Sequence, residues 1–203
     1  MSHILHLDSS PRAADSHSRR VSQEFLDAWL AHHPQDTVTS RDLGHQNIPH
    51  VTEEFIQAAY APPHAMTPGQ KQALALSDEL VAELKAADIL VFGIPMYNFS
   101  VPSVFKAYID AVVRPGVTFD PASYQGLLPG KKMFVVTARG GGGYGAGEAR
   151  ASYNMQDGQI RTAFGLIGIT DIEFIDVENT LNTDEVRTDS LHKAQEKIAA
   201  ATA

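Results

Sequence analysis

Three loops in the sequence contain residue types that suit a single ligand. The first, residues 8–18, is rich in serine and leads into a stretch of helical periodicity. Serine hydroxyls and free N–H groups at the start of a helix can bind a phosphate, and the helix dipole adds to the attraction. The alternative is that Ser16 or Ser18 only caps the helix. The loop lacks the GxxxxGK[ST] pattern, so nucleoside triphosphate hydrolysis is not supported.

The second loop, residues 93–102, follows an apolar run and is unusually aromatic. Pro95 stiffens the exit from the expected strand. Met96, Tyr97 and Phe99 offer an apolar and aromatic surface that would suit a flat heteroaromatic ring. The alternative is a hydrophobic cluster packed under a loop, with Asn98 as a turn residue. Ring binding is the better interpretation, because large apolar groups are costly to leave exposed to water.

The third loop, residues 137–147, contains four consecutive glycines. Gly140, Gly142 and Gly145 match GxGxxG, but in so glycine-rich a run the match is nearly automatic, and dinucleotide folds usually place this pattern after the first strand. The remaining inference is that bare backbone N–H groups can approach a ligand closely, with Arg139 adding a positive charge. The alternative is a flexible lid that makes no contacts.

Short apolar runs alternate with stretches of helical period, the pattern of a parallel sheet covered by helices on both faces. Ligands gather at the carboxyl ends of such strands, where the three loops begin. The expected strands are residues 4–7, 37–43, 89–94, 132–138 and 171–177.

The intervening segments predict helices, and one start is sharply defined. Thr67, Pro68 and Gln70 fit a capping box with proline in the first turn. Between the second strand and this cap, residues 44–67 form a long connector with a short helix at about residues 53–60, and long connectors tend to be functional. The other expected helices follow the first strand, cover residues 101–113, precede the fifth strand from about residue 160, and run from about 184 to 201.

Composition favours one α/β domain spanning residues 1–203. The chain is 43% hydrophobic and 20% charged, and its net charge of −8 disfavours nucleic acid or an anionic membrane as partner. With no cysteine there is no thiolate nucleophile, CxxC pair or ordinary iron–sulfur cluster, so redox chemistry needs a bound cofactor. The scattered histidines indicate no metal site. Because we find no apolar run of membrane-spanning length and no room for a signal peptide, we expect a cytoplasmic protein.

The chain resembles the FMN-dependent NADH-azoreductases, also described as NADH:quinone oxidoreductases. The resemblance covers nearly the whole chain and is most specific in residues 95–99, 116–119, 126–127, 130–132, 139–141 and 165–169. It implies a flavodoxin-like, doubly wound, five-stranded parallel sheet of order 2-1-3-4-5 with helices on both faces. In flavodoxin, which has this strand order, FMN lies at the switch point between the first and third strands.

The resemblance also implies which residues contact the cofactor. The first loop would hold the FMN phosphate, the second would line the isoalloxazine ring, and the third would meet the pyrimidine edge of that ring. Ala138 stands where the family often has a serine, which removes one hydroxyl contact. The implied FMN ligands are Ser10, Ser16, His17, Ser18, Met96, Tyr97, Asn98, Phe99, Ala138, Arg139, Gly140 and Gly141. We expect Tyr60, Phe119 and Phe164 in the substrate pocket, and a homodimer whose subunits complete each other's site.

The implied reaction is ping-pong. NADH reduces FMN and leaves, and a quinone or azo compound then takes the electrons. Because the cofactor carries the chemistry, we assign no catalytic side chain. One alternative is an FMN-binding electron carrier without a substrate site, which the long 44–67 connector argues against. The other is a dehydrogenase that holds NAD on the glycine run, which would show no flavin colour.

Overall fold

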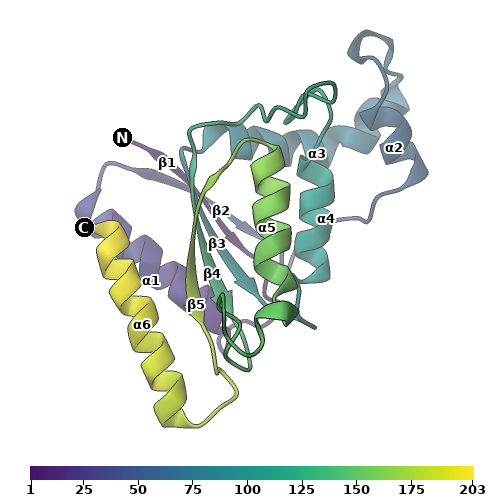
Figure 1. Cartoon of the computed structure of the whole chain (residues 1–203). Helices are drawn as coiled ribbons and strands as arrows, with labels where there is room; N and C mark the ends of the chain where they lie inside the picture. Colours follow the sequence, from purple (N-terminus) through teal and green to yellow (C-terminus); the bar gives the residue numbers. More distant parts are fainter.

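Five parallel strands form one sheet in the order β2-β1-β3-β4-β5 (Figure 1). The computed structural model describes residues 1–203, apart from the side chain of residue 63. The strand order is the expected one, and every strand lies within one residue of its expected bounds. The strands are β1 (His3–Asp8), β2 (Thr37–Asp42), β3 (Ile89–Pro95), β4 (Lys132–Ala138) and β5 (Asp171–Val177).

Helices cover both faces of the sheet, with α1 and α6 on one face and α3, α4 and α5 on the other (Figure 1). Helix α2 lies farther out, beside α3, at the opposite end of the molecule from α6. None of the described helices is both long and apolar enough to cross a membrane. The helices are α1 (His17–His32), α2 (Glu53–Ala59), α3 (Pro68–Ala86), α4 (Ser103–Val112), α5 (Met155–Leu166) and α6 (Asp184–Thr202), with short 3₁₀ turns η1 (Pro63–Ala65) and η2 (Ala151–Tyr153).

Alternation along the strands divides the core into two layers. Leu5 and Phe92 contribute to the cluster under α3, α4 and α5, whereas Ile4 and Val91 contribute to the cluster under α1 and α6. Successive side chains of a strand point to opposite faces, so strands buried on both faces are apolar throughout. All seven residues of β3 are buried. This continuous burial explains why the central strands could be recognised from sequence.

The predicted helix starts are confirmed at α3 and shifted at α4. The Thr67 side chain accepts from the backbone of Gln70, and the Gln70 side chain completes the capping box. Helix α4 begins at Ser103 rather than at residue 101, although Val101 is buried as the apolar pattern suggested. The reason is Pro102, because a residue that precedes proline is disfavoured in helical geometry.

Candidate active site

The three loops singled out from the sequence meet at one edge of the sheet. In the strand pairing, Asp8 of β1 lies opposite Gly93 of β3, and Pro95 of β3 lies opposite Ala138 of β4. Two backbone hydrogen bonds extend the contact beyond the strands, from Ser9 to the Gly93 carbonyl (3.0 Å) and from Met96 to the Ala138 carbonyl (2.8 Å). The chain passes from β1 outward to β2 and then back to β3, so this edge is the switch point of the fold.

The serines of the first loop are buried around the start of α1. Ser10, Ser16 and Ser18 are at most 5% exposed, and the hydroxyls of Ser16 and Ser18 lie 3.2 Å apart. Ser16 is the N-cap of α1, because its hydroxyl accepts from the Arg19 backbone at 3.4 Å. Ser16 therefore caps α1, and a hydroxyl that caps a helix can still contact an anion bound at the same helix start. Among the described residues, nothing accepts from the backbone N–H groups of His17 and Ser18, which leaves these donors for an anion.

Arg19 fixes the position of this loop, a role that the sequence did not reveal. Its Nε donates to the Ser10 carbonyl at 3.0 Å, and its guanidinium also pairs with Asp42 at the end of β2. Gly44 lies directly behind the loop, where an added Cβ would be 2.0 Å from the Ser10 carbonyl oxygen. The edge strand β2 therefore supports the first loop through a buttress made of Arg19, Asp42 and Gly44.

A buried polar cluster lies beneath the same loop. The Ser22 hydroxyl donates to Asp8 at 3.0 Å and lies 3.1 Å from Nε2 of His6. Burial raises the pKa of Asp8, although His6, Ser22 and Arg19 oppose the shift. Burial also lowers the pKa of His6, with the nearby Asp8 charge opposing. An added Cβ on Gly93 would lie 2.3 Å from the Asp8 carboxylate, so this part of β3 requires glycine.

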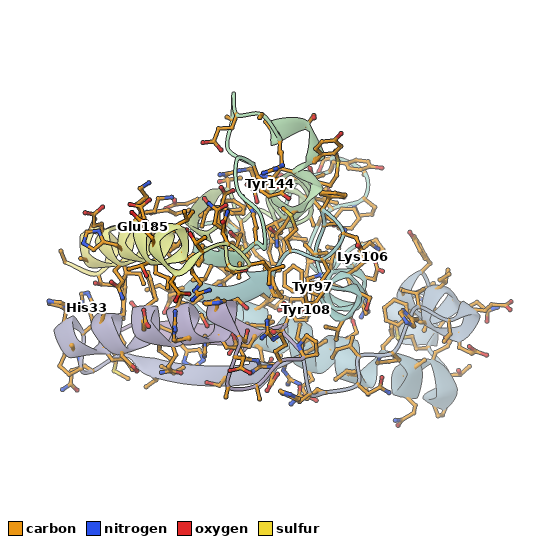
Figure 2. The ribbon with its side chains drawn as sticks, turned by 90° about the horizontal axis from the view of Figure 1, so that it is seen from below. His33, Tyr97, Lys106, Tyr108, Tyr144 and Glu185 are labelled. Carbon is orange, nitrogen blue, oxygen red and sulfur yellow. The ribbon has the colours of Figure 1, made fainter. Side chains whose placement is uncertain are left out.

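The second loop is a tight turn with two residues in left-handed geometry. Tyr97 and Ser100 exchange backbone hydrogen bonds of 2.9 and 3.1 Å around Asn98 and Phe99, whose φ angles are +48° and +71°. Positive φ is uncommon for residues other than glycine, and such strain clusters at ligand sites. The Tyr97 and Phe99 side chains are 39% and 48% exposed rather than packed under the loop. Figure 2 shows Tyr97 near the centre of this edge, with Tyr144 on the glycine-rich loop farther out.

The third loop is held in place on both sides and does not behave as a free lid. The backbone N–H groups of Asn179 and Leu181 donate to the carbonyls of Gly141 (2.9 Å) and Gly140 (3.1 Å). The Glu178 carboxylate accepts from the backbone of Gly143 at 2.8 Å. Within the described part of the chain, the N–H groups of Gly140 and Gly141 themselves have no acceptor. These two donors are therefore available to a ligand.

The Arg139 side chain does not offer its charge to a ligand, which corrects the sequence-based expectation. Its guanidinium is 2% exposed and donates to Asp157 at 2.6 Å and to Glu178 at 3.2 Å, with Asp176 at 3.3 Å and Gln156 also in contact. A buried guanidinium is retained where carboxylates neutralise it. The backbone N–H and carbonyl of Arg139 are also paired, with Val177 and Thr180, and its side chain links α5, β5 and the third loop.

The three residues expected in a substrate pocket do not come together within one chain. Phe164 is 1% exposed, and its ring packs against those of Phe92 and Phe105 at 5.8 and 6.2 Å, so it belongs to the core and not to a pocket. Phe119 is half-buried in the segment after α4, with its ring 6.1 Å from Tyr124. A core helix face and a pocket wall both present aromatic residues at helical spacing, which explains the error at Phe164.

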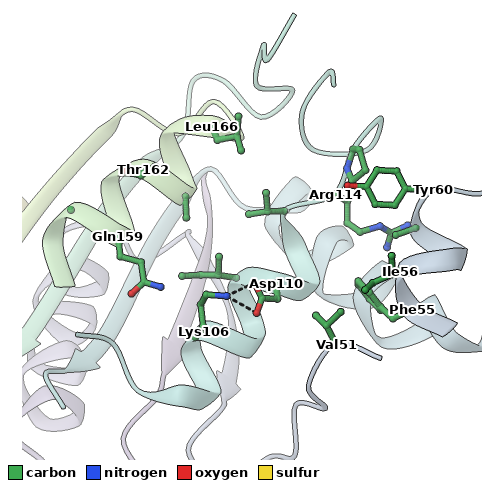
Figure 3. Close-up of a pocket in the computed structure, with 16 residues that line it drawn as sticks. Val51, Phe55, Ile56, Tyr60, Lys106, Asp110, Arg114, Gln159, Thr162 and Leu166 are labelled. Carbon is green, nitrogen blue, oxygen red and sulfur yellow. Dashed lines mark hydrogen bonds and ion pairs between the residues drawn. The ribbon is translucent and has the colours of Figure 1, made fainter. Parts of the chain in front are cut away.

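Tyr60 lines a separate groove of about 590 Å³ between α2, α4 and α5 (Figure 3). The groove is mainly apolar, and its outer wall is well exposed, with Ile56 at 50% and Tyr60 at 74%. Figure 3 shows the Lys106–Asp110 ion pair (2.6 Å) on the α4 side, and the Arg114 guanidinium lies 5.9 Å from the centroid of the Phe55 ring. Contiguous exposed apolar surface is typical of interaction sites and ligand-binding grooves.

The sheet is open and parallel, with the strand order 2-1-3-4-5. Its three central strands end in a serine loop, an aromatic turn and a glycine loop. This combination defines a flavodoxin-like protein. The family model described as "Flavodoxin-like fold" matches residues 2–201, and the chain belongs to this family.

Named relatives are similar over almost their whole length. A protein of Nostoc punctiforme named "FMN-dependent NADH:quinone oxidoreductase" is 52% identical over 98% of this chain and 97% of its own. A protein of the same name from a second Nostoc strain is 48% identical over 100% of this chain and 99% of its own. The solved structure of an azoreductase from Bacillus anthracis superposes with a TM-score of 0.88 at 26% identity, covering 100% of this chain and 99% of that one.

Proposed function

We propose that the protein is an FMN-dependent oxidoreductase that transfers electrons from NADH to quinones and azo compounds. The observation that carries the proposal is the meeting of the serine loop, the aromatic turn and the two unpaired glycine N–H donors at the switch point of the sheet. The relatives named as FMN-dependent NADH:quinone oxidoreductases and the similar azoreductase structure support the same activity.

The residues present fit the two ends of FMN. At the phosphate end, the serine hydroxyls at the start of α1 and the N–H groups of His17 and Ser18 form an anion site without a lysine. At the ring end, Met96, Tyr97, Asn98 and Phe99 supply the flat surface. Ala138 can contribute backbone only, since it lacks a polar side chain. Arg139 positions the loop instead, since its side chain points into its carboxylate cluster and its backbone is paired with Val177 and Thr180.

When bound, FMN accepts a hydride and passes the electrons on, which is chemistry that no side chain of the chain supplies. The aromatic turn would hold the ring, orient it and exclude water from one of its faces. The N–H groups of Gly140 and Gly141, which have no acceptor among the described residues, would meet the pyrimidine edge of the ring and stabilise negative charge there. We assign no side chain as acid or base, because a solvent proton suffices for the reduced acceptor.

We include a homodimer in the proposal. The groove between α2, α4 and α5 exposes apolar side chains that a second copy of the chain would cover. The substrate pocket is then completed by residues of both subunits, with Tyr60 and Phe119 as its candidates in this chain. A cytoplasmic location also belongs to the proposal, and cell fractionation tests it.

The decisive experiment is to record the visible spectrum of the purified protein, before and after anaerobic addition of NADH. We expect flavin absorption bands that bleach with NADH and return on addition of a quinone. A protein that stays colourless after incubation with FMN contradicts the proposal. If NADH reduces the flavin but the protein shows no steady turnover when quinone is present, the electron carrier is favoured instead.

A further inference from the structure

The turn between β5 and α6 runs alongside the glycine-rich loop and binds three of its carbonyl groups. The backbone N–H groups of Asn179, Thr180 and Leu181 donate to the carbonyls of residues 139–141, at distances of 2.9, 3.0 and 3.1 Å. Residues 179–181 therefore form a fourth segment at the carboxyl edge of the sheet. The segment is neither serine-rich nor glycine-rich, so the sequence did not single it out.

These carbonyl contacts fix the directions of the amide groups that follow them. A trans peptide unit is planar, so the carbonyl of one residue and the N–H of the next point in opposite directions. The described chain has no cis peptide bond. The Arg139 carbonyl shares its peptide unit with the Gly140 N–H, and the Gly140 carbonyl shares its unit with the Gly141 N–H. Because both carbonyls donate no proton and face the turn as acceptors, both N–H groups point away from the turn.

The turn and the loop also fit closely at their α-carbons. An added Cβ at Gly140 would lie 2.8 Å from Cδ1 of Leu181, and one at Gly142 would lie 2.5 Å from Nδ2 of Asn179. The φ angle of Asn179 is +60°, a left-handed conformation that asparagine tolerates. The directions of the loop amides therefore depend on the turn as well as on the loop itself.

Thr180 differs from its neighbours in the turn because it contacts one carbonyl twice. Its backbone N–H donates to the Arg139 carbonyl at 3.0 Å, and its hydroxyl donates to the same oxygen at 3.1 Å. A carbonyl oxygen has two lone pairs, so both hydrogen bonds can form together. Linked hydrogen bonds polarise and strengthen one another. The Gly140 N–H, at the other end of this peptide unit, is therefore a better donor than it would be without the hydroxyl.

We propose that Thr180 is a positioning residue that aims and strengthens the Gly140 N–H, so that its hydroxyl helps to set the reduction potential of bound FMN. The inference rests on the proposed function, in which the N–H groups of Gly140 and Gly141 would meet the pyrimidine edge of the ring. Reduction increases the negative charge at that edge, so a stronger donor there favours the reduced cofactor over the oxidised one. Thr180 acts through the peptide unit and needs no contact with the ring.

The test compares Thr180→Val with the unmodified protein, both loaded with FMN. Valine keeps the β-branched shape and the backbone N–H, and it removes the hydroxyl bond to the Arg139 carbonyl. Redox titration against a reference dye gives the midpoint potential, and fluorescence titration of the apo protein gives the affinity for oxidised FMN. We expect the ratio of the affinities for reduced and oxidised FMN to fall about threefold, which lowers the two-electron midpoint potential by about 15 mV.

Three further variants make the result specific. Thr180→Ser restores a hydroxyl and should return the potential to that of the unmodified protein. Thr183→Val removes a hydroxyl from the same connection, where the side chain makes no capping hydrogen bond to α6, and should leave the potential unchanged. If Thr180→Val does not fold, Thr180→Ala is titrated in its place with the same expectation.

A lower potential in Thr180→Val that Thr180→Ser restores supports the inference. An unchanged potential in Thr180→Val overturns it even if FMN binds more weakly, because a merely structural residue would weaken the binding of both redox states equally. An equal shift in Thr183→Val also overturns it, because the effect would then not depend on the bond to the Arg139 carbonyl. Failure of the unmodified protein to bind FMN contradicts the proposed function instead, so the two failures are distinguishable.

Discussion

The shape of the first loop depends on the absence of a side chain at Gly44. At Gly44, a Cβ would meet the Ser10 carbonyl at 2.0 Å and the Arg19 guanidinium at 2.6 Å. We therefore predict that Gly44→Ala destabilises the protein by about 1–3 kcal/mol through overpacking and weakens FMN binding about tenfold. Denaturant unfolding and fluorescence titration with FMN measure the two effects. The control is Gly69→Ala, whose Cβ would lie 3.9 Å from its nearest neighbour. It should lower neither the stability of the protein nor its affinity for FMN. An unaltered FMN affinity in Gly44→Ala would show that the buttress does not position the first loop for FMN binding.

A second prediction concerns the stability that Asp42 contributes and that the protein loses at acid pH. Burial opposes ionisation of Asp42, but hydrogen bonds from Arg19 and His45 outweigh it and lower its pKa from 3.8 to about 2. An acid with a depressed pKa in the folded state contributes stability above its unfolded pKa and loses that contribution as pH falls through the folded value. We therefore expect part of the stability to be lost between pH 3.8 and about 2. The share is modest, because Asp42 is partly exposed.

The measurement is urea unfolding across this pH range for the unmodified protein and for Asp42→Asn. The variant should show a shallower decline of unfolding free energy with acid. Asp171→Asn, which removes an exposed carboxylate at the start of β5, should follow the unmodified protein. Parallel declines in all three proteins would show that Asp42 makes no such contribution.

At the scale of elements, the turn between β3 and α4 combines strain with exposure. Asn98 has a φ of +48°, which asparagine tolerates but a β-branched residue does not. We predict that Asn98→Val costs about 1–3 kcal/mol of stability and weakens FMN binding, whereas Asn98→Gly leaves stability within about 0.5 kcal/mol. Thermal unfolding of the apo proteins measures the first effect and FMN titration the second. Equal stability of the two variants would mean that the turn relaxes without cost.

The elements themselves were largely predictable, because each depends on a local signal. Strands β3 and β4 are continuous apolar runs, and Thr67 and Gln70 define the start of α3. Side-chain directions were not predictable in the same way. Arg139 turns toward Asp157 and Glu178, residues from elements distant in sequence, and so its role depends on packing.

The same limit applies to the rest of the site. The buttress needs β2 beside β1, so it does not follow from the spacing of its members. Phe164 was misplaced because a periodic apolar pattern identifies a buried face without saying what that face contacts. Loops at strand ends were found because the parallel fold itself brings those ends together.

At the scale of the whole molecule, the exposed apolar groove between α2, α4 and α5 is the surface that we expect to form the homodimer interface. A charged residue in a buried interface is strongly unfavourable, so we predict that Ile56→Glu converts the proposed homodimer to a monomer. Sedimentation velocity measures the change. Val186→Glu, an equivalent substitution at an exposed apolar position on α6, should leave the assembly state unaltered. A dimer that persists in Ile56→Glu would place the interface on another surface.

The buried cluster around Arg139 constrains how the sequence can change. Three carboxylates, Asp157, Asp176 and Glu178, share this one guanidinium. Removal of the cation alone leaves Asp157 and Glu178 without an ion-pair partner in a poorly solvated place, whereas Asp176 keeps Lys197 at 3.7 Å. Substitutions here are therefore not independent of one another. We expect related chains with a neutral residue at position 139 to carry fewer acids at 157, 176 and 178, so that these four positions covary as a group.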